Sequence, residues 1–186
     1  MAINRRLQEH LDQTRSSYAV LPHFDSYTAA EIAHSAHVKG GQLAKVVVLR
    51  DATGDDFMVV LPATRRLDPR TTHQVTGRVG VRLEDERELK QMFPDCEVGA
   101  MPPFGALYGM PMVVDPCLLE GKDIYFQAGN HHELVLMRRE LYAHIARPFL
   151  SRTCLHREPR RARGADDGSV AVTGLTAGER GTAVKP

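Results

Sequence analysis

Apolar residues follow a helical rhythm at the start of the chain and an extended one soon after it. Ile3, Leu7 and Leu11 recur at four-residue spacing, which places them on one face of a helix and predicts a short amphipathic helix. The residues over 18–24 are expected to be extended. The chain therefore begins with one helix and one strand.

The next signals are a helix cap and a strand pair. Thr28 is followed three residues later by Glu31, a capping-box pattern that predicts a helix over 29–36. Two β-branched, apolar runs over 46–49 and 57–61 are separated by a turn-rich stretch, which predicts a hairpin of buried strands.

The second half mixes both kinds of element. Gly and Pro are too frequent over 99–111 for regular structure, so this stretch is expected to be a shaped loop. The other expected elements are a helix over 69–75, a strand over 79–83, a helix over 85–92, strands over 112–114 and 124–127, and an amphipathic helix over 133–145. This order predicts an α/β protein of the α+β type, with a mixed, largely antiparallel sheet or partial barrel flanked by helices.

Composition adds a domain boundary to this picture. The chain has 186 residues, 42% of them hydrophobic and 25% charged, as expected of one globular domain. From residue 151 onward large apolar side chains almost disappear, and such a segment cannot bury enough surface to offset its ordering entropy. We expect a folded domain over 1–150 and a disordered, Gly- and Arg-rich tail over 151–186.

Apolar runs and cysteines bear on the compartment. The longest apolar runs are far shorter than the roughly 20 residues of a membrane-spanning helix. The charged N-terminal segment leaves no apolar core for a signal peptide, so we expect a cytoplasmic protein. Cys96, Cys117 and Cys154 are widely spaced and contain no C-x-x-C pair. They are interpreted as two thiols of the domain and one of the tail, and Cys96 and Cys117 are not expected to be nucleophiles.

Charge limits the kind of nucleic-acid contact that is expected. The formal net charge is only +1, so the chain is not a strongly basic nucleic-acid binder. Any RNA contact has to come from a local patch.

Three features are candidates for chemistry. Lys45 directly precedes a buried apolar run, where an ammonium must reach solvent or a partner; a lysine at a strand edge satisfies the same pattern. The loop over 99–105 combines glycines with prolines, which fits a preorganised backbone cradle or a rigid turn. The segment over 128–133 reads AGNHHE, in which Asn130 is interpreted as a helix cap.

Metal and serine-hydrolase chemistry are weakly supported. His34 and His37 lie three residues apart, and His131, His132 and Glu133 are other potential ligands, but no H-E-x-x-H or G-x-S-x-G motif is present. We expect neither a metal nor another cofactor.

Taken in order, four segments of the chain resemble the YbaK/prolyl-tRNA-synthetase-associated domain family. They are TAAEIAHSAHVKGGQLAKVVVLRD (28–51), VVLPATRRLD (59–68), FPDCEVGAMPPFGALYGMPMVVD (93–115) and IYFQAGNHHELVLM (124–137). The resemblance implies this family's fold and a trans-editing aminoacyl-tRNA deacylase, which cleaves the ester between a wrong amino acid and the 3′-terminal adenosine of tRNA. The removed amino acid is expected to be small, with alanine on tRNA-Pro preferred.

The resemblance also implies site residues. Lys45 matches the family's essential lysine. The family's G-x-x-x-P loop and A-G-S-H-like segment, which hold the aminoacyl group and terminal adenosine, correspond here to Gly99, Ala100, Met101, Pro102 and Pro103 and to Gly129, Asn130 and His131. Asn130 replaces the family's more usual serine.

The expected partners are the acceptor end of a mischarged tRNA and an aminoacyl-tRNA synthetase. Lys39, Arg65 and Arg66 flank the expected pocket and are candidates for phosphate contacts. The hypothesis is that the Lys45 ammonium holds the terminal phosphate or the developing oxyanion while loop amides fix the ester. A non-catalytic module that binds tRNA or a synthetase is the alternative.

Overall fold

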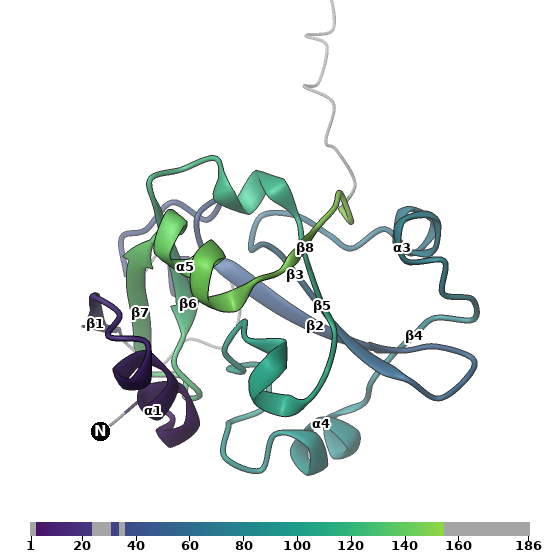
Figure 1. Cartoon of the computed structure of the whole chain (residues 1–186), viewed down its shortest axis with the longest axis horizontal. Helices are drawn as coiled ribbons and strands as arrows, with labels where there is room; N and C mark the ends of the chain where they lie inside the picture. Colours follow the sequence, from purple (N-terminus) through teal and green to yellow (C-terminus); the bar gives the residue numbers. More distant parts are fainter. Residues whose placement is uncertain (1–2, 24–30, 34–35, 155–186) are drawn as a thin grey trace, which may run out of the picture. The chain divides into compact units, whose positions relative to one another are not determined.

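Two β-sheets form the frame of the molecule. The computed structural model describes residues 3–23, 31–33 and 36–154 (Figure 1). All elements described here belong to the compact unit Met1–His156. In this part of the chain no helix is long and apolar enough to cross a bilayer.

The smaller sheet has three antiparallel strands in the order β1-β7-β6. They are β1 (Tyr18–Pro22), β7 (Glu133–Arg138) and β6 (Asp123–Gln127). β7 lies in the middle and pairs with β1 and β6 along their length.

The larger sheet has five strands in the order β4-β2-β3-β5-β8. The hairpin of β2 and β3 is antiparallel, whereas β5 pairs in parallel with both β3 and β8. A single bridge between Leu43 and Tyr125 connects this sheet to β6. The strands are β4 (Arg82–Leu83), β2 (Ala44–Arg50), β3 (Asp56–Pro62), β5 (Met112–Val114) and β8 (Phe149–Leu150). The mixed α/β architecture predicted from the sequence is confirmed, in the form of two open sheets.

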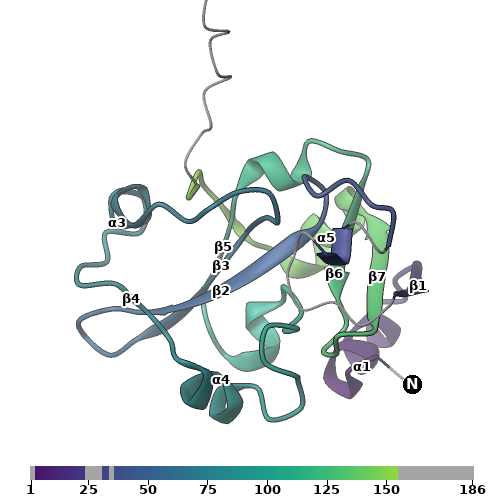
Figure 2. The same cartoon turned by 180° about the vertical axis from the view of Figure 1, so that it is seen from behind.

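Helices surround these sheets. Figures 1 and 2 show α1 beside the small sheet and α3 near the opposite end of the molecule, close to β4. Aspartate side chains cap the first turns of α3 and α4, because their carboxylates accept the free backbone N–H groups there. The helical elements are α1 (Arg5–Gln13), α3 (Pro69–Thr76), α4 (Glu86–Met92), α5 (Arg139–Ala146) and two 3-10 turns, η1 (Gly105–Tyr108) and η2 (Pro116–Leu119).

Most elements lie where the hydrophobic pattern predicts them. Ile3, Leu7 and Leu11 are all buried in the main core, which confirms the N-terminal amphipathic segment. The helices over 69–75 and 85–92 are confirmed within a residue, and the hairpin is confirmed with a first strand that begins two residues earlier than predicted. The strand predicted over 79–83 is reduced to two residues, and the loop over 99–111 contains η1. The predicted cap Thr28 lies outside the described residues.

The helix predicted over 133–145 is wrong in its first half. Glu133–Arg138 is strand β7, and the helix begins only at Arg139. Leu134 is buried in one hydrophobic cluster, and Val135 and Met137 are buried in the main core, so both faces of β7 are covered. Such strands carry apolar residues on both faces, a pattern that short windows do not separate from a helix.

The boundary predicted at residue 150 falls a few residues too early. The backbone N–H of Ser151 donates to the Val114 carbonyl (3.1 Å), and those of Thr153 and Cys154 donate to Asp115 Oδ2 (2.9 and 3.1 Å). Cys154, which the sequence assigned to the tail, is therefore buried in the folded unit. The predicted tail beyond it lies outside the described residues.

Candidate functional site

Lys45 occupies the beginning of β2, where the strand emerges from the core. Strand alternation places its side chain on the same face as Val47 and Leu49. Its Nζ donates a hydrogen bond to the Arg65 carbonyl oxygen at 2.7 Å. Burial lowers the pKa of this ammonium below that of an ordinary lysine, and the nearby Arg66 charge lowers it further. Within the described chain no carboxylate forms an ion pair with Lys45, so a positive charge is available at this position.

A small cavity lies beside Lys45. Its volume is about 230 Å³, below the roughly 300 Å³ at which pockets for drug-sized ligands begin. Its described lining is apolar except for two side chains, Lys45 and Gln127, and comprises Ile32, Leu43, Ala44, Lys45, Val46, Gly99 and Gln127. The cavity thus joins the beginning of β2, the end of β6 and the predicted glycine loop.

Gly99 is the member of the predicted loop that lines this cavity. Its φ of +92° is a conformation that residues with a Cβ rarely adopt. Its N–H donates to Met101 Sδ at 3.2 Å, and a thioether sulfur is a weak acceptor. The rest of the predicted loop, Ala100, Met101, Pro102 and Pro103, is buried and does not appear in the cavity lining. These residues therefore shape the loop from behind.

The segment over 129–131 is fastened to this loop by backbone hydrogen bonds. Glu97 N–H donates to the Gly129 carbonyl (2.9 Å), and Gly129 N–H donates to the Ala100 carbonyl (3.0 Å). Gly129 has a φ of +96°, and a Cβ added there would lie 2.6 Å from Asn4 Cβ. Both segments predicted to hold substrate thus form one bonded unit.

Asn130 does not cap a helix, because a strand follows it. It closes the turn between β6 and β7: its Oδ1 accepts the His132 N–H (2.9 Å), and its Nδ2 donates to Glu133 Oε2 (3.0 Å). The side chain is therefore engaged in shaping the turn.

His131 orients Gln127 in the cavity wall. His131 Nε2 lies 3.0 Å from the Val98 carbonyl oxygen, which only accepts, so Nε2 carries a proton. In the neutral ring Nδ1 is then an acceptor, and the Gln127 amide nitrogen donates to it at 3.1 Å. Gln127 Oε1 accepts no hydrogen bond within the described chain. A buried carboxamide thus offers an oriented acceptor at the cavity.

The sequence interpretation missed Gln127. Its signal was a polar residue ending the apolar run IYFQ directly before the AGNHH segment. Of the predicted phosphate contacts, Arg66 is exposed and lies near Lys45, and Arg65 supplies the carbonyl that Lys45 binds. Lys39 is exposed and absent from the cavity lining.

Burial disfavours the thiolate form of all three cysteines. Burial raises the pKa of Cys96 to about 11 and that of Cys154 to about 12, and it also raises the pKa of Cys117. Among the described residues, no cluster of three His, Cys, Asp or Glu side chains is arranged to hold a metal ion.

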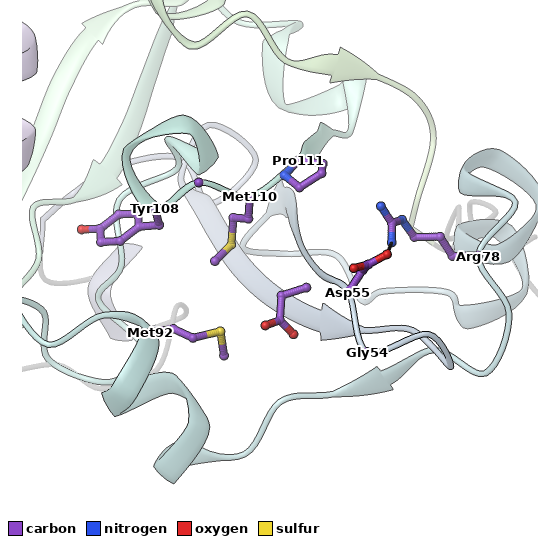
Figure 3. A pocket seen from close by; sticks show the side chains of 9 residues that line it. Gly54, Asp55, Arg78, Met92, Tyr108, Met110 and Pro111 are labelled. Atoms are coloured by element: carbon purple, nitrogen blue, oxygen red, sulfur yellow. Dashed lines mark ion pairs between the residues drawn. The ribbon is translucent and has the colours of Figure 1, made fainter.

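A larger hollow of about 570 Å³ lies elsewhere, at the tip of the β2–β3 hairpin. Figure 3 shows Asp55 and Arg78 facing each other on one side of it, with Met92, Tyr108 and Met110 on the other. Arg78 pairs with Asp51 and Asp55, and Asp56 is held by Arg50 through two bonds of 2.8 and 3.0 Å. The charged groups of this hollow are thus already paired within the protein.

Comparisons with known proteins give one matching family model and two named relatives. The model of the aminoacyl-tRNA editing domain matches residues 23–144. The multifunctional Ser/Thr-tRNA deacylase ProXp-y of Escherichia coli K12 is 26% identical over 151 residues, which cover 79% of this chain and 90% of that protein. The same named protein of E. coli O157:H7 matches equally well.

Solved structures show the same fold. The crystal structure of a hypothetical protein superposes with a TM-score of 0.73 at 22% identity and covers 81% of this chain and all (100%) of the other. The crystal structure of a proposed trans-editing enzyme for prolyl tRNA synthetase superposes with a TM-score of 0.69 at 22% identity, covering 82% and 97% of the two chains.

Proposed function

Because this chain belongs to the aminoacyl-tRNA editing domain family, we propose that it hydrolyses the ester of a mischarged tRNA in trans, with the residues around the Lys45 cavity as its active site. The enzyme class expected from the sequence, an aminoacyl-tRNA deacylase, agrees with the family match and with the named relatives. The substrate is then the acceptor end of tRNA, and a synthetase is a partner of the same proposal.

The observation that carries the assignment is the available ammonium of Lys45 at the mouth of a small, mostly apolar cavity. Strand alternation directs the ammonium toward Arg65 and Arg66 and away from the face of Ala44 and Val46. This favours binding of the phosphate of the terminal adenosine over contact with the ester. Lys45 then acts by placing the reacting ester in the cavity.

The ester carbonyl is assigned to the N–H of Gly99. This N–H now donates to Met101 Sδ, which lies behind the loop, so the loop has to turn the N–H toward the cavity when substrate binds; a thioether is a weak acceptor, so little is lost. As water attacks the carbonyl carbon, negative charge develops on the carbonyl oxygen, and this N–H stabilises it. The bond to the 3′ oxygen then breaks, that oxygen takes up the proton released by water, and the products are free amino acid and tRNA.

Gln127 is assigned to the α-ammonium of the aminoacyl group. Every aminoacyl ester carries this group, and Gln127 Oε1 is an acceptor whose orientation is set by His131. A hydrogen bond to a charged group contributes about 1.5–3 kcal/mol. The interaction holds the α-ammonium of the aminoacyl group against the cavity wall at Gln127 and so fixes the orientation of a small substrate.

The cavity volume favours a small amino acid. Synthetases need such a correcting activity, because their pockets distinguish amino acids that differ by one methylene by only about 1–3 kcal/mol of binding free energy. Alanine on tRNA-Pro stays a prediction, while the E. coli relatives carry the name of Ser/Thr-tRNA deacylases. We propose that the substrate is one of these three aminoacyl groups.

The deciding experiment measures release of labelled amino acid from tRNAs bearing alanine, serine, threonine or cysteine, with the uncatalysed rate subtracted. The expected result is discharge of the alanyl, seryl or threonyl group, unaffected by a chelator; discharge of the cysteinyl group alone would contradict the proposed substrate. Binding and protection of every charged tRNA would instead establish the non-catalytic module. Loss of activity on chelation would indicate a metallohydrolase.

A further inference from the structure

A second hollow adjoins Lys45 on the other side of the candidate site. Its volume is about 310 Å³, and two cations, Lys45 and Arg66, lie along it. Its remaining wall is apolar and consists of Val47, Leu49, Leu67, Pro69, Val81 and Leu83. We call this hollow the β2–β4 groove. Lys45 lines both the groove and the 230 Å³ cavity, so the two hollows meet at this residue.

No carboxylate of the described residues neutralises the charges of the groove. Within the described chain, neither Lys45, Arg65 nor Arg66 forms an ion pair with a carboxylate, in contrast to Arg50, Arg78 and Arg82. Arg66 is close enough to Lys45 to lower its pKa. Cations held this close without a counterion favour an anion between them, and a phosphodiester is the anion that a tRNA end carries.

We propose that the β2–β4 groove binds the nucleotide that precedes the terminal adenosine of the tRNA. This inference rests on the proposed function, in which the aminoacyl group occupies the 230 Å³ cavity and the adenosine phosphate lies at Lys45. The next nucleotide then follows on the far side of Lys45. Its base packs on the apolar wall, and the phosphodiester that joins it to the adenosine lies at Lys45 and Arg66.

Three minimal substrates separate these contacts. They are the aminoacyl esters of adenosine, of adenosine 5′-monophosphate and of the dinucleotide CpA. Adding the phosphate lowers KM through Lys45 and Arg66. Adding the cytidine lowers KM again by about tenfold, the size of one base contact.

Two exposed leucines provide a matched pair of variants. Leu83 in the groove is 64% exposed, and Leu150 on β8, at the opposite edge of the same sheet, is 50% exposed. Leu83→Ser shrinks the KM ratio between the monophosphate and CpA esters toward one, whereas Leu150→Ser leaves this ratio unchanged. Arg66→Ala shrinks the KM ratio between the adenosine and monophosphate esters toward one. Arg87→Ala, which removes another exposed arginine, leaves this ratio unchanged.

Binding of unacylated adenosine 5′-monophosphate and CpA, measured by titration calorimetry, tests the groove without hydrolysis. Tighter binding of CpA that depends on Leu83 supports the groove even if no ester is cleaved, in which case only the proposed function fails. Equal binding of the two nucleotides, or equal KM values for their esters, overturns the inference. So does a Leu83→Ser variant that weakens all three substrates by the same factor.

Discussion

The Lys45 cavity and the hairpin hollow of Figure 3 differ in a way that volume does not reveal. The hairpin hollow is larger, about 570 against 230 Å³, and has more charged residues on its wall. Its charged groups are already paired within the protein: Arg78 with Asp51 and Asp55, and Asp56 with Arg50. The small cavity offers an oriented amide oxygen and a cation that no carboxylate of the described residues pairs with. The small cavity is therefore the better candidate binding site, because its polar groups can still bind a ligand, whereas those of the large hollow are already paired.

The largest expected effect comes from removing the charge at the small cavity. Lys45→Met keeps most of the side-chain stem and removes the ammonium, and we expect kcat/KM to fall about 10²-fold or more because charged phosphate contacts are lost. The matched change in the large hollow, Asp55→Asn, leaves kcat/KM unchanged. A loss confined to KM supports the phosphate contact, whereas a loss confined to kcat would assign Lys45 to the oxyanion. Equal activity of the two variants would remove the distinction between the hollows.

The second effect concerns the amide oxygen at the cavity. Gln127→Met keeps the length and apolar stem and removes the acceptor, so kcat/KM should fall by about 10- to 100-fold. The loss should be equal for alanyl and seryl esters, since both carry the α-ammonium. A loss restricted to hydroxyl-bearing substrates would show that Oε1 contacts the side chain instead. The melting temperature checks that the fold is retained.

The third effect compares how much stability each region loses when a Cβ is added to one of its glycines. Gly129→Ala forces a Cβ to within 2.6 Å of Asn4 Cβ at a φ of +96°, whereas Gly54→Ala, on the wall of the large hollow, has a similar φ of +91° and open space. Both variants carry backbone strain of about 1–3 kcal/mol, and only the first adds a clash. We expect the melting temperature of Gly129→Ala to lie several degrees below that of Gly54→Ala, at about 2–4 °C per kcal/mol. Equal melting temperatures would mean that α1 moves aside without cost.

This contrast also explains what the sequence could and could not predict. Lys45 and Gly99 stand out locally, as a lysine before an apolar run and a glycine in a Pro-rich loop. Gln127 does not, because its role depends on His131 and Val98, which only the folded chain brings together. For the same reason β7 was mistaken for a helix: its pairing with β1 joins residues more than a hundred positions apart. Local pattern is informative for the hairpin and for short helices such as α3 and α4, and uninformative where distant strands decide.

The smallest expected effect is a shift in pH dependence. Phosphate binding requires the charged form of Lys45, so kcat/KM is full below the pKa of this ammonium and falls as pH rises through it. Burial and the Arg66 charge lower that pKa, and the fall therefore begins at lower pH than for an ordinary lysine. Arg66→Ala removes the repulsion but not the burial, so the alkaline limb should move to higher pH while the activity below it decreases. Arg78→Ala, in the paired network of the large hollow, should leave the limb in place.

The measurement is the pH profile of kcat/KM after subtraction of spontaneous ester hydrolysis. A limb unmoved by Arg66→Ala would mean that another group titrates there, and the positive charge at the small cavity would then no longer explain the difference between the two hollows.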